Sequence, residues 1–103
     1  MTRVTLMLVA VLAACATTDP PESEMAAARA MVAQARPVAE AQAPQELAAA
    51  QGKLARAELA MQRGHYGHAK LLAEQAEADA KLAWTSAENA RAQRELNQQR
   101  SVR

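Results

Sequence analysis

Few side chains of this sequence have the type and spacing for chemistry. His65 and His68 are three residues apart, so they could present two imidazoles on one helical face and bind a metal ion. Spacing indicates no third ligand, because Glu58 and Glu74 occupy ordinary surface positions. The sequence also shows no nucleophile–base pair, phosphate-binding loop or paired catalytic carboxylates. We therefore expect no metal, no cofactor and no enzymatic activity, with a metal or small-ligand carrier as the weaker alternative.

Cys15 is the one residue for which the sequence predicts a specific covalent modification. It is the only cysteine, so an intramolecular disulfide is impossible, and it directly follows Leu12, Ala13 and Ala14. This stretch looks like a bacterial lipobox, in which a branched residue and two small residues precede an obligatory cysteine. We expect the Cys15 thiol to receive a diacylglyceryl group before the leader is cleaved. A plain secretory signal or a short membrane anchor with a chance cysteine is the alternative.

The residues before Cys15 have the organisation of a signal peptide over positions 1–14. Arg3 gives a positive n-region, and Val4–Ala14 is an apolar run of eleven residues, shorter than the about 20 that a transmembrane helix needs. Two or three acyl chains would anchor the mature chain stably. In enteric bacteria an Asp after the modified cysteine favours the inner membrane, so Ala16 favours the outer one. We expect a lipid-anchored protein of the bacterial cell envelope that faces the periplasm.

The composition favours helices and excludes folds with a core of large residues. Alanine contributes 28 of the 103 residues, whereas the chain has no Phe or Ile, one Trp and one Tyr. A β-sandwich or a doubly wound α/β domain needs many branched and aromatic residues. A deep apolar pocket needs walls that this chain cannot build. Alanine is the best helix former, so we expect an all-α domain whose helices pack closely on small side chains.

The periodicity of apolar residues predicts a first short helix after a lipidated tether. The tether covers residues 15–23, and the helix covers about 24–36. Pro37 lacks an N–H donor and clashes with the preceding turn, so we expect the helix to end or kink there. Residues 38–43 could form a further helical turn or part of a connection.

An antiparallel helical hairpin follows, and it forms the main part of the predicted fold. Pro44 suits the first turn of a helix over about 44–63, and Gly64 suits the left-handed residue that ends it. A second helix over about 66–97 completes the hairpin, and residues 98–103 form a basic, frayed tail. The apolar stripe of this second helix comprises Ala69, Leu72, Ala76, Ala80, Ala83, Ala87 and Ala90.

The hairpin turn looks like the middle of one tetratricopeptide repeat. Gly64, Tyr66, Ala69 and Ala76 have the spacing at which, in that repeat, the glycine permits the turn, the aromatic ring plugs the hairpin mouth and the alanines allow close helix contact. Only one such unit is visible, and about three are needed for a stable solenoid. A single repeat-like hairpin is therefore the better description.

Asp79 and Trp84 are the two side chains of the last predicted helix whose surroundings matter most. Asp79 lies among alanines close to the apolar stripe of this helix. It either pairs with Lys53 or Arg56 of the preceding helix or stays solvated. Trp84 is the largest side chain after the leader. It either caps the hairpin core against the first helix, as we expect, or forms an exposed anchor for a partner or lipid.

Three stretches of the chain carry a resemblance to a known family. They are Ala43-Pro44-Gln45-Glu46-Leu47 with Lys53-Leu54-Ala55-Arg56-Ala57, then Gly64-His65-Tyr66, then Leu72 to Ala80. Over about Met25 to Gln93 the chain resembles the domain-of-unknown-function family 4398, a family of small alanine-rich bacterial envelope proteins. Members are similar in having a lipoprotein leader, and some carry a peptidoglycan-binding domain further on. The resemblance implies location and architecture rather than a reaction.

These observations predict a non-enzymatic envelope lipoprotein, held to the membrane by acylated Cys15, whose helices bind a partner protein or self-associate. A small chain with few large side chains buries little area alone, which favours self-association. The alternative is a periplasmic spacer or peptidoglycan-associated structural lipoprotein, although Pro37, Pro44 and Gly64 interrupt any continuous coiled coil. No nucleic-acid partner is expected for an exported protein. Contact of the basic tail with anionic lipid or of the chain with peptidoglycan is left open.

Overall fold

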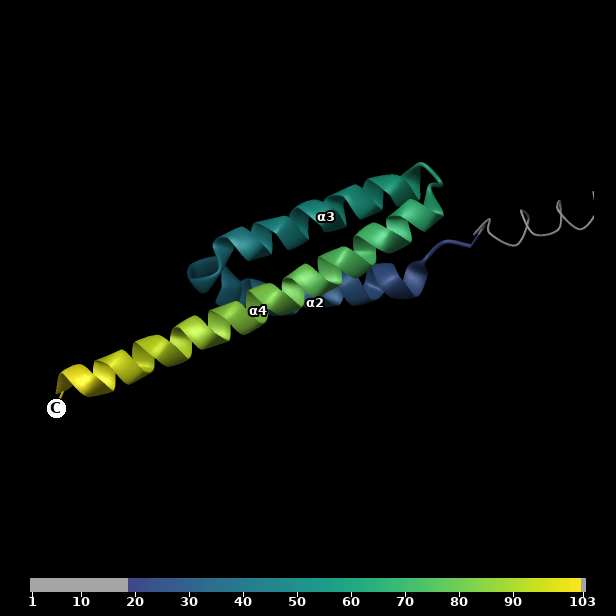
Figure 1. Cartoon of the computed structure of the whole chain (residues 1–103). Helices are drawn as coiled ribbons and strands as arrows, with labels where there is room; N and C mark the ends of the chain where they lie inside the picture. Colours follow the sequence, from purple (N-terminus) through teal and green to yellow (C-terminus); the bar gives the residue numbers. More distant parts are fainter. Residues whose placement is uncertain (1–18, 103) are drawn as a thin grey trace, which may run out of the picture.

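The chain folds into three helices that pack side by side, as the computed structural model shows for residues 19–102 (Figure 1). They are α2 (Glu22–Gln42), α3 (Pro44–Gln62) and α4 (Tyr66–Val102). The chain reverses direction at each connection, so α2 and α4 run parallel and α3 runs antiparallel to both. The all-α class and the α3–α4 hairpin agree with the expectation from sequence. The first helix is more than an addition to the hairpin, because α2 packs against α4 about as extensively as α3 does.

α2 continues through Pro37 to Gln42, so the predicted helix end near Arg36 is wrong. Residues 38–42 form the further helical turn that was one of the two alternatives for this stretch. Proline removes one backbone hydrogen bond and presses on the carbonyl four residues earlier, here that of Ala33. Both Pro37 and Ala33 are exposed, so water can bind the freed carbonyl. The residues after the proline also continue the inner face, since Val38 is half-buried and Ala39 fully buried. Burial of this last stretch offsets the cost of the proline.

The connection between α2 and α3 is the single residue Ala43, which is itself buried. Its N–H donates to the Ala39 carbonyl at 2.8 Å, and its carbonyl accepts from the Leu47 N–H at 3.1 Å. Both polar groups of the connecting residue are therefore satisfied within the helices that it joins. Pro44 is the first residue of α3, where its missing N–H has no helical partner to lose.

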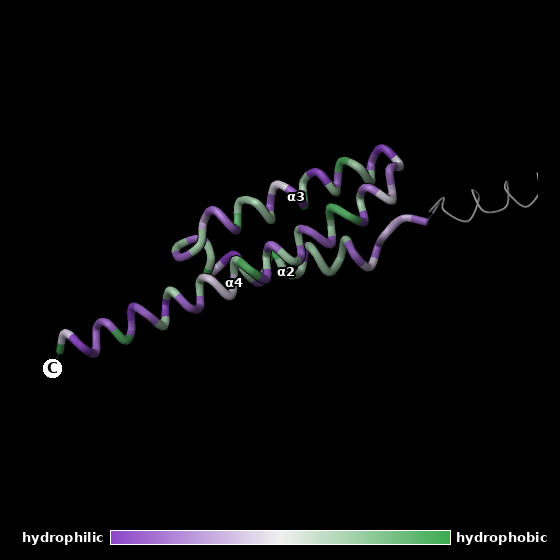
Figure 2. Tube along the Cα trace, in the orientation of Figure 1, coloured by the Kyte–Doolittle hydropathy of each residue, from purple (hydrophilic) through white to green (hydrophobic). Residues whose placement is uncertain are grey.

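α4 is the longest helix and extends past the end of the bundle. It runs to Val102, five residues beyond the predicted end near Asn97, so residues 98–102 continue the helix instead of forming a frayed tail. Its 37 residues span about 55 Å at 1.5 Å per residue. Residues 91–102 are exposed on every side, and Figure 2 shows that this part is mainly hydrophilic. The extension therefore stands outside the core.

The core is lined mostly by alanine. Thirteen of the eighteen buried hydrophobic residues are alanines, and the five larger ones are Met25, Met31, Val32, Leu47 and Leu72. The predicted stripe of α4 is buried from Ala69 to Ala87, and only Ala90 is half-exposed. Small side chains on facing helices let the backbones approach toward the low end of the usual about 8–10 Å separation. Leu54 packs against both halves of the core and joins them.

Candidate functional site

The predicted lipidation site lies outside the described residues. The structure describes residues 19–102, and the four residues of the lipobox-like stretch, Leu12, Ala13, Ala14 and Cys15, precede them. What it does describe is the start of the folded part, since α2 begins at Glu22, seven positions after Cys15. No helix within residues 19–102 is both long and apolar enough to cross a membrane.

The α3–α4 turn is built around Gly64. This residue has a φ of +74°, in the left-handed region that side-chain-bearing residues rarely adopt. The Gly64 N–H donates to the Met61 carbonyl at 3.1 Å, and the His65 N–H donates to the Ala60 carbonyl at 2.9 Å. These two bonds form a Schellman motif, which satisfies the last carbonyls of α3.

The remaining turn residues serve packing. Tyr66 begins α4 and is half-exposed, whereas Ala69 and Ala76 have no exposed surface. An alanine with no exposed surface leaves little room for a larger side chain at the helix interface. Ala69 and Ala76 therefore fix the spacing of the helices and offer no chemistry of their own.

Trp84 is on the surface, so the expectation that it caps the core is wrong. Its side chain is 46% exposed, although its neighbour Ala83 is completely buried. The buried alanines of α4 (Ala76, Ala80, Ala83 and Ala87), here called the alanine seam, pack so closely between the helices that an indole does not fit there. Leu71 and Leu82 of the same helix are also about half-exposed, so α4 places several of the largest side chains of the fold outside the core.

Ion pairs tie the three helices together at their edges. Lys53 of α3 contacts Asp79 of α4 with a Nζ–Oδ2 distance of 2.6 Å, which confirms one of the two partners predicted for this carboxylate. Both side chains are about one-third exposed, so the pair is screened less than a fully solvated one. The other ion pairs between helices are Arg29–Glu58 at 3.2 Å and Lys70–Glu24 at 3.9 Å.

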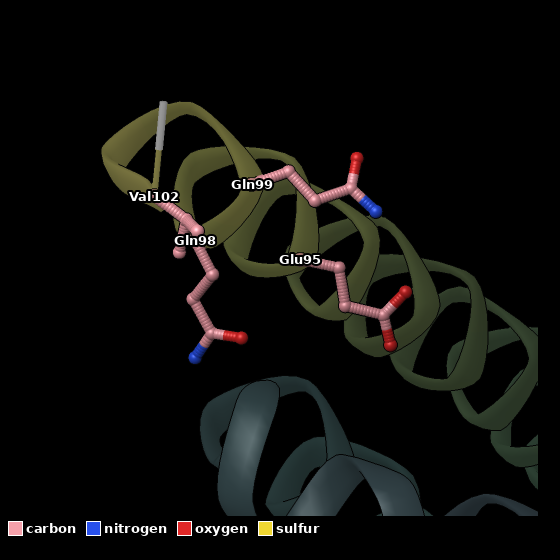
Figure 3. A pocket seen from close by; sticks show the side chains of 4 residues that line it. All are labelled: Glu95, Gln98, Gln99 and Val102. Carbon is pink, nitrogen blue, oxygen red and sulfur yellow. The ribbon is translucent and has the colours of Figure 1, made fainter.

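A first surface hollow lies on the extension of α4 and has the character of open surface. The four side chains that line it, Glu95, Gln98, Gln99 and Val102, all come from this one helix (Figure 3). A hollow formed by exposed side chains of a single helix cannot enclose a substrate or exclude water from it. Within residues 19–102, moreover, no three metal-ligating side chains gather in one place.

A second hollow, which the sequence analysis did not predict, lies beside the α3–α4 turn. It is formed by residues of the last two turns of α3 and the first turns of α4 and has a volume of about 160 Å³. Its lining comprises Arg56, Leu59, Ala60, Arg63, His65, His68 and Leu72. In the sequence the two histidines stand out only as an isolated pair. The spacing of three and four residues between Arg56, Leu59, Ala60 and Arg63 places these residues on one helical face, and it could have predicted that they lie together beside the turn.

Comparison with known proteins identifies one family. The family model described as "Domain of unknown function (DUF4398)" matches residues 23–99, which is more than half of the chain. The match covers nearly all of α2, all of α3 and most of α4, and it does not include the lipobox-like stretch. Neither a curated protein nor a solved structure matches the chain.

Proposed function

The chain belongs to the DUF4398 family, and on that premise we propose that it is a non-enzymatic lipoprotein of the bacterial cell envelope. In this proposal the acyl chains on Cys15 hold it to a membrane, with the outer membrane favoured because Ala16 follows the cysteine. The three-helix module faces the periplasm and acts by binding.

The observation that carries the proposal is the short distance in sequence between Cys15 and the folded module. Residues 16–21 separate the cysteine from α2, and six residues span at most about 20–22 Å when fully extended. A lipid on Cys15 would therefore hold the bundle close to the membrane surface. Two or three acyl chains make such anchoring stable, whereas one chain binds only marginally.

The shape of the described surface supports binding over catalysis. The hollow on α4 is open and comes from one helix, and the hollow beside the turn is below the about 300 Å³ at which small-molecule pockets begin. The alanine core fills the space between the helices with side chains that have no reactive groups.

Acylation of Cys15 is the decisive test. We expect the wild-type chain, expressed in bacteria, to incorporate an alkyne fatty acid that is detected by click labelling, and Cys15→Ser to lose the whole signal. Ala16→Ser is the matched control, because it changes the neighbouring residue and keeps the thiol. Equal labelling of wild type and Cys15→Ser would show that the lipoprotein assignment is wrong.

α4 carries the surface that we assign to a protein partner or a second copy of the chain. Trp84 is 46% exposed, and Arg91 and Gln98 follow at a spacing of seven on the same helical face. Residues 91–102 of the helix are all exposed, and isolated helices shorter than about 12–15 residues are marginal in water. A partner that covers this face would stabilise the extension.

A photo-reactive amino acid placed at position 84 tests this surface in living cells. We expect crosslinked adducts from position 84 and none from position 78, where Ala78 is an exposed residue of the same helix. The mass of an adduct separates a dimer of this chain from a complex with another protein. Equal crosslinking from both positions, or none from either, would remove the assignment of α4 as the binding surface.

The length of α4 favours one second candidate, a periplasmic spacer or peptidoglycan-associated structural lipoprotein. The helix spans about 55 Å, and its free end lies at the end of the bundle opposite the tether (Figure 1). It therefore points away from the anchored end. Co-sedimentation with purified peptidoglycan checks this candidate, which requires binding by the full chain and loss of binding when the chain stops after Ala90.

A further inference from the structure

The hollow beside the α3–α4 turn has the charge of an anion site. Arg56 comes from α3, Arg63 directly follows the last residue of α3, His65 lies in the turn, and His68 lies in the first turn of α4. None of the seven residues that line the hollow is acidic. Two permanently charged guanidinium groups in one small hollow disfavour a metal cation and favour an anion.

The acidic side chains nearest in sequence, Glu58 and Glu74, do not line the hollow. Glu58 accepts a hydrogen bond from the Nε of Arg29 at 3.2 Å. Of the ion pairs formed within residues 19–102, none includes Arg56, Arg63 or either histidine. The two arginines therefore keep their hydrogen-bond donors available for a ligand.

The floor of the hollow is apolar, and the N-terminus of α4 lies beside it. Ala60 and Leu72 are each only 4% exposed, which keeps water away from one side of the hollow. A charge-assisted hydrogen bond is stronger where water is partly excluded. α4 begins here with no acidic residue in its first turn, whereas α2 and α3 each carry one or two. No carboxylate side chain therefore occupies the positive end of the α4 dipole, although the negative end of the α3 dipole lies at the same turn.

The hollow lies at the end of the bundle nearest the tether. The α3–α4 turn and the first residues of α2 are at the same end in Figure 1, and the Lys70–Glu24 pair joins α4 to α2 there. If Cys15 is acylated, residues 16–21 hold this end within about 20–22 Å of the membrane. The closeness of the hollow to the membrane rests on the proposed function, whereas the charge of the hollow does not.

We propose that the hollow formed by Arg56, Arg63, His65 and His68 binds phosphate, and that its source is the headgroup of anionic phospholipids. A guanidinium group matches a phosphate with two parallel hydrogen bonds, and two such groups lie on one wall. The volume of about 160 Å³ suits a single phosphate group and is too small for a drug-sized ligand. The site would fix the orientation of the bundle on the membrane that anchors it.

The test uses the full chain with Cys15→Ser, so that binding does not depend on acylation. Arg56→Gln with Arg63→Gln removes the charge of the hollow. Arg94→Gln with Arg100→Gln is the matched control, because it removes two exposed arginines from the far end of α4. Circular dichroism verifies that each variant keeps its helices. Every protein carries the same leader, so its contribution to vesicle binding cancels in the comparison.

The first measurement is co-sedimentation with phosphatidylcholine vesicles, with and without phosphatidylglycerol. Each basic residue near an anionic surface contributes about fivefold to binding, so we expect the hollow variant to lose about thirtyfold of the gain from phosphatidylglycerol. The control variant should lose less than about twofold, since its arginines lie far from the membrane-facing end. An equal loss in both variants would reduce the effect to net charge and overturn the proposal.

The second measurement separates the two sources of phosphate. Inorganic phosphate is titrated while the ring resonances of His65 and His68 are followed by NMR, and the shifts should vanish in the hollow variant. Shifts without any preference for phosphatidylglycerol would overturn the lipid assignment in favour of soluble phosphate. No shifts and no vesicle preference would overturn the site itself. Neither result depends on fatty-acid labelling of Cys15, so failure of the lipoprotein proposal is detected separately.

Discussion

Gly64 determines the α3–α4 turn through its backbone conformation alone. Its φ of +74° belongs to the left-handed region, and a Cβ built on it would meet no atom within 4 Å. The requirement for glycine is therefore conformational and not steric. Gly52 is also open to solvent, but it lies in the interior of α3 with ordinary helical geometry. Replacement by alanine should therefore change the free energy of unfolding in opposite directions at Gly64 and Gly52.

We predict that Gly64→Ala destabilises the protein by about 1–2 kcal/mol, the cost of holding an L-residue in the left-handed conformation. Gly52→Ala should instead stabilise it by about 0.5–1 kcal/mol, because alanine loses less backbone entropy in a helix. Urea unfolding followed by circular dichroism gives both values. A destabilising Gly52→Ala would contradict the open surroundings of that residue.

At the scale of the element, each helix is held by a narrow stripe of small residues. The α4 stripe has no exposed surface at Ala76, Ala80, Ala83 and Ala87, so a larger side chain there must separate the helices. Ala78, on the same helix, faces solvent. The effect on stability of replacing an alanine by a larger residue should therefore depend on whether that alanine faces the core or the solvent.

Ala83→Leu should destabilise the bundle by about 1–3 kcal/mol through overpacking. Ala78→Leu is the control, and its effect should stay within about 0.5 kcal/mol because it is a surface substitution. Thermal and urea unfolding of the two variants provide the comparison. Similar effects at both positions would mean that the seam is not closely packed.

α2 tests how packing can override a helix-breaking residue. Proline in a helix interior costs about 3 kcal/mol, and about 1 kcal/mol of this is recovered because proline also restricts the unfolded chain. Pro37 is exposed, and alanine at this position keeps every neighbour of the inner face. We predict that Pro37→Ala raises the free energy of unfolding by about 2 kcal/mol, as measured by urea denaturation. A loss of stability would indicate a native contact of the proline ring that its exposure does not suggest.

At the scale of the whole molecule, the bundle and the extension of α4 should have different stabilities. The core ends near Ala87, whereas residues 91–102 are all exposed. Helices of this length without tertiary contacts are marginal in water. The extension should therefore open locally far more easily than the core helices.

A chain that stops after Ala90 should lose helical circular dichroism and keep its stability within about 0.5 kcal/mol, because it loses no core contact. Hydrogen exchange of the full chain should show fast amides over residues 91–102 and slow amides around Ala76. A large loss of stability on truncation would reveal that the extension is part of the cooperative unit, as it would be in a self-associated form.

Most features of the helical elements follow from local signals in the sequence. Alanine content and the three-four spacing of apolar residues indicated helices, and Pro44 and Gly64 marked the start and end of α3, because both act through the local backbone. For Asp79 the sequence left three alternatives, which were pairing with Lys53, pairing with Arg56 and solvation, and the structure shows the pair with Lys53. Local propensities and spacing suffice for the helices and for both ends of α3.

The faces of the helices that are covered depend on how the three helices pack together. α2 continues through Pro37 because its inner face is covered. Trp84 stays on the surface because the buried alanines pack closely. Arg56 and Arg63 lie beside the histidines because the end of α3 meets the start of α4. These features depend on contacts between residues far apart in the chain. Packing of neighbouring helices decides them, and the periodicity of a single helix does not contain that information.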